Sequence, residues 1–207
     1  MSGKDVLVLL SGGLDSTTLA AKALSEGRLA AVLFVDYSQA NRHQEDRSTY
    51  SWCKDNGVER HIFTLSGWSR VSETNLSLRS LSSALHVGVG EPGPRVVPNR
   101  NMILVAGAIH YAASLGCTEV WIGPTADDQE NYADCRPEWV ESANRMASFW
   151  GISVVAPFVG MYKREVVALA RQLGVDISST WSCYQPNVYT QACGTCNACV
   201  LRASALT

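Results

Sequence analysis

The chain has 207 residues, of which 46% are hydrophobic and 17% charged, with a formal net charge of −2 and a pI of about 6.1. This composition excludes a disordered chain and fits one globular domain with a small appended module. A mildly acidic chain without a basic stripe is not expected to grip a nucleic-acid backbone, so we expect a small-molecule substrate. We find no signal peptide and no run of roughly 18 apolar residues, and therefore expect a soluble cytoplasmic protein rather than a membrane protein.

The first third of the chain alternates between strand-like and helix-like segments. Short runs rich in Val and Leu are typical of buried parallel strands, and the segments between them have helical patterns that end at glycine. In chain order we expect a strand at 6–10, a helix at 17–26, a strand at 29–36, a helix at 39–56 and a strand at 58–65. This order predicts an α/β fold, a parallel sheet with helices on both faces.

The rest of the chain continues the alternation after an irregular stretch. Residues 66–98 are rich in Ser, Gly and Pro and predict an active-site loop. Beyond it we expect helices at 101–116, 137–150 and 162–173, strands at 119–123 and 152–156, and a polar loop at 124–135. Trp139, Phe149 and Trp150 are expected to face the core. We divide the chain into an α/β domain, residues 1–175, and a cysteine-bearing tail, residues 176–207.

A glycine-rich string, Ser11-Gly12-Gly13-Leu14-Asp15-Ser16, follows the first predicted strand and opens the first helix. Glycines let the backbone turn tightly and let a phosphate approach the main chain. The free N–H groups and the positive dipole end of the helix face such an anion. The alternative interpretation is a plain glycine turn capped by Asp15. The string lacks both the Walker A ending and the Gly-x-Gly-x-x-Gly pattern.

The string resembles the pyrophosphate-binding loop of the PP-loop ATP pyrophosphatases, which share an adenine nucleotide alpha hydrolase-like fold. These enzymes cleave ATP between the α- and β-phosphates and adenylate an oxygen of their substrate. The resemblance implies that ATP with Mg²⁺ is bound, and that Asp15 is oriented toward the Mg²⁺. It also implies contacts to ATP from Leu10, Ser11, Gly12, Gly13, Leu14, Asp15, Ser16 and Thr17, with Asp36 close to the nucleoside.

Four of the seven cysteines lie in the last 25 residues, at Cys183, Cys193, Cys196 and Cys199. Cys-x-x-Cys spacing and a total of four thiolates are typical of a closed, structural Zn²⁺ site. Paired disulfides, an iron–sulfur cluster and catalytic persulfide chemistry are the alternatives that the residues leave open. We favour zinc, which would hold a tail too short to form its own core.

The tail also narrows the family, because its cysteine pattern resembles the C-terminal signature of the 7-cyano-7-deazaguanine synthases. Other segments match that family in the right order across nearly the whole chain. They are Asp36-Tyr37-Ser38-Gln39, Val97-Pro98-Asn99-Arg100-Asn101, Asp128 with Tyr132-Ala133-Asp134-Cys135-Arg136, and Lys163.

This resemblance implies an ATP-dependent, C–N bond-forming ligase of queuosine or deazaguanine nucleoside biosynthesis. The family converts 7-carboxy-7-deazaguanine and ammonia to the nitrile through an adenylated carboxylate and an amide. The resemblance also implies that the protein is a homodimer. The candidate catalytic residues are Asp15, Arg100 and Lys163. The candidate substrate-binding residues are Tyr37, Gln39, Arg100, Asn101, Asp128, Tyr132, Asp134 and Arg136.

Some positions depart from the family pattern, mainly around the expected base pocket. Asn99 and Ser38 replace glycines, and Asn tolerates the left-handed backbone region better than most residues. The segment 129–133 is more polar than the family stretch. Two alternatives therefore stay open beside nitrile formation: an enzyme that stops at the amide or joins the deazaguanine to another amine, and a PP-loop tRNA-modifying enzyme.

Overall fold

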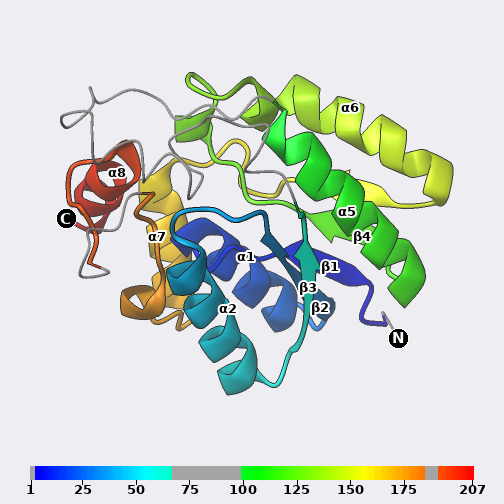
Figure 1. Ribbon diagram of the computed structural model, residues 1–207, viewed down its shortest axis with the longest axis horizontal. Coiled ribbons are helices and arrows are strands. Elements are labelled where there is room, and N and C mark those ends of the chain that lie inside the picture. Colours follow the sequence, from blue (N-terminus) through cyan, green and yellow to red (C-terminus); the bar gives the residue numbers. More distant parts are fainter. Residues whose placement is uncertain (1–2, 67–98, 185–190) are drawn as a thin grey trace.

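The computed structural model describes residues 3–66, 99–184 and 191–207, and the predicted loop at 66–98 lies almost wholly outside these ranges. The described elements alternate as predicted (Figure 1). In chain order they are β1 (Val6–Leu9), α1 (Leu14–Ser25), β2 (Leu29–Asp36), α2 (Arg42–Asn56), β3 (Glu59–Thr64), α5 (Arg100–Leu115), β4 (Glu119–Trp121), α6 (Pro137–Ala147), β5 (Ser153–Val155), α7 (Lys163–Gln172) and α8 (Asn197–Leu206).

The five strands form one parallel sheet in the order β3-β2-β1-β4-β5. The chain builds outward from β1 to β3 and then returns to the other side of β1 with β4. Strands β1 and β4 are therefore neighbours whose connections leave in opposite directions. In such sheets the crevice beyond the carboxyl ends of these strands is the usual ligand site.

Alternate residues of the strands enter two cores, one on each face of the sheet. On one face, Leu7, Leu33 and Val120 pack with α5 and α6. On the other, Val8 and Val32 pack with α1, α2 and α7. Both faces of each central strand are thus buried, which explains the continuous apolar runs of the sequence and confirms the predicted α/β class.

The tail packs on the same body. Its Ala205 and Leu206 lie against Leu14, Val167 and Ala170, so α8 sits beside α7 and the start of α1 (Figure 1). The division into an α/β domain and a tail at residue 175 remains a prediction. None of the helices in the described ranges has the length and apolarity needed to cross a membrane.

Two short 3₁₀ helices, Ala126–Asp128 and Ala133–Cys135, occupy the predicted polar loop. The prediction that Phe149 and Trp150 face the core is wrong, because they are 87% and 72% exposed. Helix α6 ends at Ala147 and the chain tightens into a 3₁₀ turn over Ser148–Trp150, so these side chains leave the apolar stripe of the helix. Trp139 does pack against the core.

Candidate active site

The loop between β1 and α1 is shaped by one glycine. Gly12 has a φ of +76°, and a Cβ there would lie 2.8 Å from the Ser48 Cβ and 2.9 Å from the Glu45 carbonyl oxygen. The loop is therefore pressed against α2, and only glycine combines this backbone conformation with this clearance. Gly12 supports the loop from behind and does not line the cavity.

Two hydroxyls gather at the start of α1. The Ser11 and Ser16 hydroxyls lie 3.0 Å apart, and the Ser11 N–H donates to the Ser16 hydroxyl at 3.2 Å. With Gly13 they line a cavity at the N-terminus of the helix, where free N–H groups favour an anion. The predicted residues Leu10 and Leu14 also line this cavity, whereas Thr17 is 2% exposed and lies within the helix.

Asp15 and Lys163 meet at the same end of the cavity, where their side chains form an ion pair across 148 positions of the chain. Burial raises the pKa of the Asp15 carboxyl; Lys163 opposes this shift, while Asp128 and Asp127 add to it. The second Asp15 oxygen, Oδ1, is buried without a hydrogen-bond partner among the described residues. A buried carboxylate oxygen beside a phosphate loop fits a magnesium ligand.

An apolar slot adjoins the phosphate loop at the ends of β1, β2 and β4. It is lined by Leu9, Leu33, Phe34, Val35, Leu104, Val105 and Ile122. Its position at the point where the strand order reverses matches the crevice expected for a nucleotide base.

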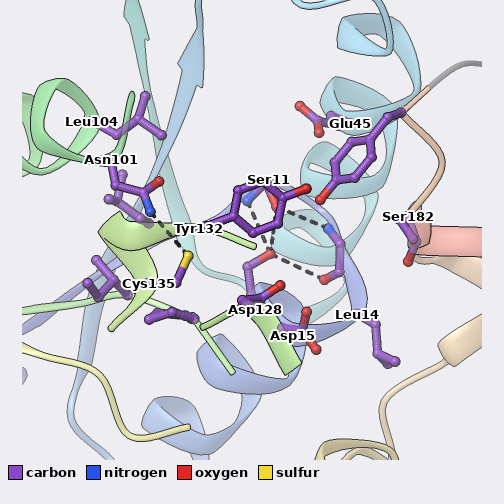
Figure 2. A pocket seen from close by; sticks show the side chains of 18 of the residues that line it. Ser11, Leu14, Asp15, Glu45, Asn101, Leu104, Asp128, Tyr132, Cys135 and Ser182 are labelled. Carbon is purple, nitrogen blue, oxygen red and sulfur yellow. Dashed lines mark hydrogen bonds between the residues drawn. The ribbon is translucent and has the colours of Figure 1, made fainter. Parts of the chain in front are cut away.

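A polar and aromatic wall faces this slot. Tyr37, Arg100, Tyr132 and Tyr184 line the cavity together, and the Arg100 guanidinium donates a hydrogen bond to Tyr37. Burial opposes the charge on Arg100, but the surrounding tyrosines and Asp134 outweigh it and raise its pKa further. Arg100 is therefore a fixed cation, suited to a planar oxyanion. Figure 2 shows Tyr132 projecting among the lining residues Ser11, Asp128 and Cys135.

Asn99 gives Arg100 its place at the start of α5. Its φ is +57°, so the predicted left-handed turn survives the loss of the family glycine. Ser38 also adopts a positive φ, +61°, where the family pattern has glycine. Asn101 lines the cavity, and its N–H and side-chain amide bond to Asp134 at 3.1 and 2.9 Å.

Several predicted site residues lie behind the cavity lining instead of in it. Asp36 pairs with Arg42, Gln39 is 1% exposed, and Asp134 accepts from the start of α5. Arg136 is exposed and donates to the Gln129 carbonyl at 3.0 Å. Asp128 does line the cavity, but its Oδ2 accepts from the N–H and hydroxyl of Thr125. Contacts of these residues with a ligand remain predictions.

The four tail cysteines converge as predicted, with all four sulfur atoms within 4.8 Å of one another. Tetrahedral zinc–thiolate geometry needs sulfur separations of about 3.8 Å, so the set fits a metal ion. The Cys193 N–H donates to the Cys183 sulfur at 3.2 Å, and the Cys196 N–H to the Cys193 sulfur at 3.4 Å. A hydrogen bond from Cys183 lowers the pKa of Cys196 to about 4, whereas burial raises that of Cys199 to about 11. All seven cysteines are free thiols in this structure.

The tail also completes the cavity, which the sequence did not indicate. Trp181, Ser182, Tyr184 and Arg202 are part of the lining. The backbone N–H of Trp181 donates to the Gly12 carbonyl at 2.8 Å, so the tail is hydrogen-bonded directly to the phosphate loop.

Glu45, on α2, is a further cavity residue that the sequence did not predict. Glu45 lines the cavity, and burial raises its pKa to about 7. No local motif marks it, because its position depends on how α2 packs against the phosphate loop.

A parallel sheet with a glycine-rich phosphate loop at its reversal point, an adjoining apolar slot and an Asp–Lys pair defines an ATP-using enzyme of the PP-loop class. Solved structures agree at the level of the fold. NMN synthetase from Francisella tularensis superimposes with a TM-score of 0.55 over 93% of this chain and 71% of that one, at 18% sequence identity.

Sequence comparison identifies the family. Residues 5–207 match the family described as queuosine biosynthesis protein QueC, and the chain belongs to that family. The 7-cyano-7-deazaguanine synthase of Marinobacter nauticus is 36% identical over 97% of this chain and 91% of its own length. The synthase of Pseudomonas syringae pv. syringae is 35% identical over 99% and 92%.

Proposed function

We propose that this protein converts 7-carboxy-7-deazaguanine and ammonia to 7-cyano-7-deazaguanine and uses two molecules of ATP, each of which yields AMP and pyrophosphate. The observation that carries the proposal is the likeness to synthases of this reaction along 97–99% of the chain. One continuous cavity that joins a phosphate loop to a wall with a fixed cation supports it.

The phosphate loop and the apolar slot would hold ATP. The Ser11 and Ser16 hydroxyls and the start of α1 bind the phosphates, and the slot between β2 and α5 takes the adenine. Lys163, which pairs with Asp15, would balance the charge that develops on the departing pyrophosphate. Asp15, through its unpartnered oxygen, would hold a Mg²⁺ ion, which when bound neutralises the phosphate oxygens.

The acceptor would lie against the polar and aromatic wall. Arg100 orients the substrate carboxylate, whose oxygen attacks the α-phosphorus as the bond to pyrophosphate breaks. Ammonia then attacks the acyl carbon, AMP leaves, and one proton is lost to give the amide. In the second cycle the amide oxygen attacks the α-phosphorus. Loss of AMP and of both N–H protons leaves the nitrile.

The four cysteines would hold a structural zinc ion that fixes the tail. The closed thiolate set offers no open position for a substrate, so the metal's contribution is to folding. Trp181 and Asn41 transmit that constraint, because they bond to Gly12 and to the Cys183 carbonyl respectively. We further propose that the protein is a homodimer, that it is cytoplasmic and that it uses free ammonia. These three features rest on the family resemblance alone.

The two alternatives are not favoured. The relatives from Marinobacter and Pseudomonas are nitrile-forming synthases in name, and the four tail cysteines converge as a set that could hold one metal ion. The polar departures at 129–133 remain the place where the end point of the reaction could change, since Asn131 and Tyr132 line the cavity.

The test is mass spectrometry of the products after incubation with Mg-ATP, ammonium and 7-carboxy-7-deazaguanine. We expect the nitrile with two AMP per molecule, and no product from Asp15→Ala. Glu141→Gln, on the exposed side of α6, is the control and should keep full turnover. Accumulation of the amide, or AMP formation independent of the deazaguanine, would overturn the proposal.

A further inference from the structure

Glu45 is the candidate that the sequence did not identify. Its carboxylate enters the cavity from α2 (Figure 2), and each oxygen accepts one hydrogen bond. Oε2 accepts from the Gln39 amide at 2.7 Å and Oε1 from the Asn41 amide at 2.9 Å. A carboxylate oxygen has two acceptor sites, so each keeps one for a ligand.

The two amides are locked in the orientation that presents N–H groups to Glu45. The Gln39 oxygen accepts from the Tyr37 N–H at 3.0 Å, and its nitrogen also donates to the Val35 carbonyl. The Asn41 nitrogen donates to the Cys183 carbonyl at 3.2 Å as well. Backbone partners therefore fix both amides as donors, and the group that they hold must be an acceptor.

Among the carboxylates that line the cavity, Glu45 is the one that we expect to accept from a ligand. Of the other acids in the lining, Asp15 pairs with Lys163, Asp127 accepts from the Lys163 N–H, and Asp128 caps a 3₁₀ helix. Glu45 takes part in none of the ion pairs found among the described residues.

The chemistry around Glu45 suits a flat heterocycle. Tyr37, Tyr132 and Tyr184 supply aromatic faces in the same cavity, and Arg100 supplies a cation for an oxyanion. A deazaguanine has two adjacent donors, its ring N1–H and its 2-amino group. A carboxylate receives such a pair with two parallel, charge-assisted hydrogen bonds.

We propose that Glu45 is the specificity residue that binds the N1–H and 2-amino edge of the deazaguanine, while Arg100 takes the carboxylate at the other end. The inference rests on the proposed function and names the acceptor residue for it. Asp134, a candidate substrate-binding carboxylate in the sequence, instead accepts from the start of α5. The partly buried position of Glu45 in the cavity lining supports it, because a desolvated charge is stabilised by a ligand that donates to it.

The experiment compares two ligands by calorimetry, in the presence of a non-hydrolysable ATP analogue: 7-carboxy-7-deazaguanine and the same compound without its 2-amino group. We expect the parent protein to prefer the amino compound by about 10- to 100-fold, the range for one charge-assisted hydrogen bond. In Glu45→Gln the preference should fall to about threefold or less. Glu45→Asp should keep a preference of about tenfold at lower affinity.

Controls separate the two levels of the claim. Glu141→Gln should behave as the parent, and binding of the ATP analogue should be the same in all variants. A Glu45→Gln protein that keeps the parental preference overturns the inference, as does one that loses turnover while its preference is unchanged. A parent protein that binds neither deazaguanine overturns the proposed function itself. Should Glu45→Gln not fold, Glu45→Asp decides, because a preference and an affinity unchanged from the parent protein there contradict the inference.

Discussion

Replacing Gly12 by alanine should destabilise the protein more than the same change at any other glycine that has a positive φ among the described residues. A left-handed backbone costs a residue with a Cβ about 1–2 kcal/mol. The new Cβ would also meet the Glu45 carbonyl oxygen at 2.9 Å and the Ser48 Cβ at 2.8 Å. Crowding of this kind costs about 1–3 kcal/mol, so we expect a total loss of about 2–5 kcal/mol.

Gly27→Ala is the matched control for this prediction. Gly27 has a φ of +70°, close to that of Gly12, but nothing lies within 4 Å of the point that a Cβ would occupy there. It should therefore lose only the conformational part, about 1–2 kcal/mol. Urea unfolding of both variants measures the difference. Equal losses in the two, within about 0.5 kcal/mol, would refute the idea that the phosphate loop is tightly packed on α2.

Three further predictions concern Glu45, Lys163 and the cysteines. Burial raises the pKa of Glu45 from 4.5 to about 7, so the folded protein binds more protons than the unfolded chain between these values. Its free energy of unfolding should fall as the pH rises through that window, and Glu45→Gln should reduce the fall. Lys163→Met should lower ATP turnover by about 100- to 1,000-fold, because the partner of Asp15 is lost. Arg164→Met, whose guanidinium stacks on a tyrosine, should leave turnover unchanged. Cys196→Ser should lose most of the bound zinc and lower the melting temperature.

The Glu45 prediction is checked by urea unfolding at about pH 5 and pH 7.5. The Lys163 prediction is checked by initial-rate assays of AMP release, and the Cys196 prediction by metal analysis. An identical pH dependence in Glu45→Gln would contradict the burial of that charge. Equal losses in the Lys163 and Arg164 variants would remove the specific role of Lys163. Full zinc content in Cys196→Ser would contradict the four-thiolate site.

Much of the fold follows from local patterns. The predicted helix stops at Gly27, Gly57 and Gly174 all have a positive φ, because glycine alone takes that conformation without cost. Strands β1 and β2 were predictable since both of their faces are covered and nearly all of their residues are apolar. The four cysteines were predictable because their spacing is itself the signal.

What local patterns could not predict depends on tertiary packing. Glu45 lies on a polar helix and resembles any solvated glutamate until α2 is packed against the phosphate loop. Gln39 belongs to a family motif, yet it does not line the cavity, and its amide donates to Glu45. Phe149 and Trp150 continue the apolar pattern of α6 in sequence, but the switch to a 3₁₀ turn exposes them.

The hydrogen bond from the Trp181 N–H to the Gly12 carbonyl has a consequence for folding during synthesis. The sheet can form once β5 has left the ribosome, because its strands need nothing from the tail. The phosphate loop, however, gains this partner only when a segment far along the chain has emerged and wrapped back. The earliest part of the molecule to be made therefore gains this hydrogen bond late in synthesis, and until then the cavity also lacks Trp181, Ser182, Tyr184 and Arg202.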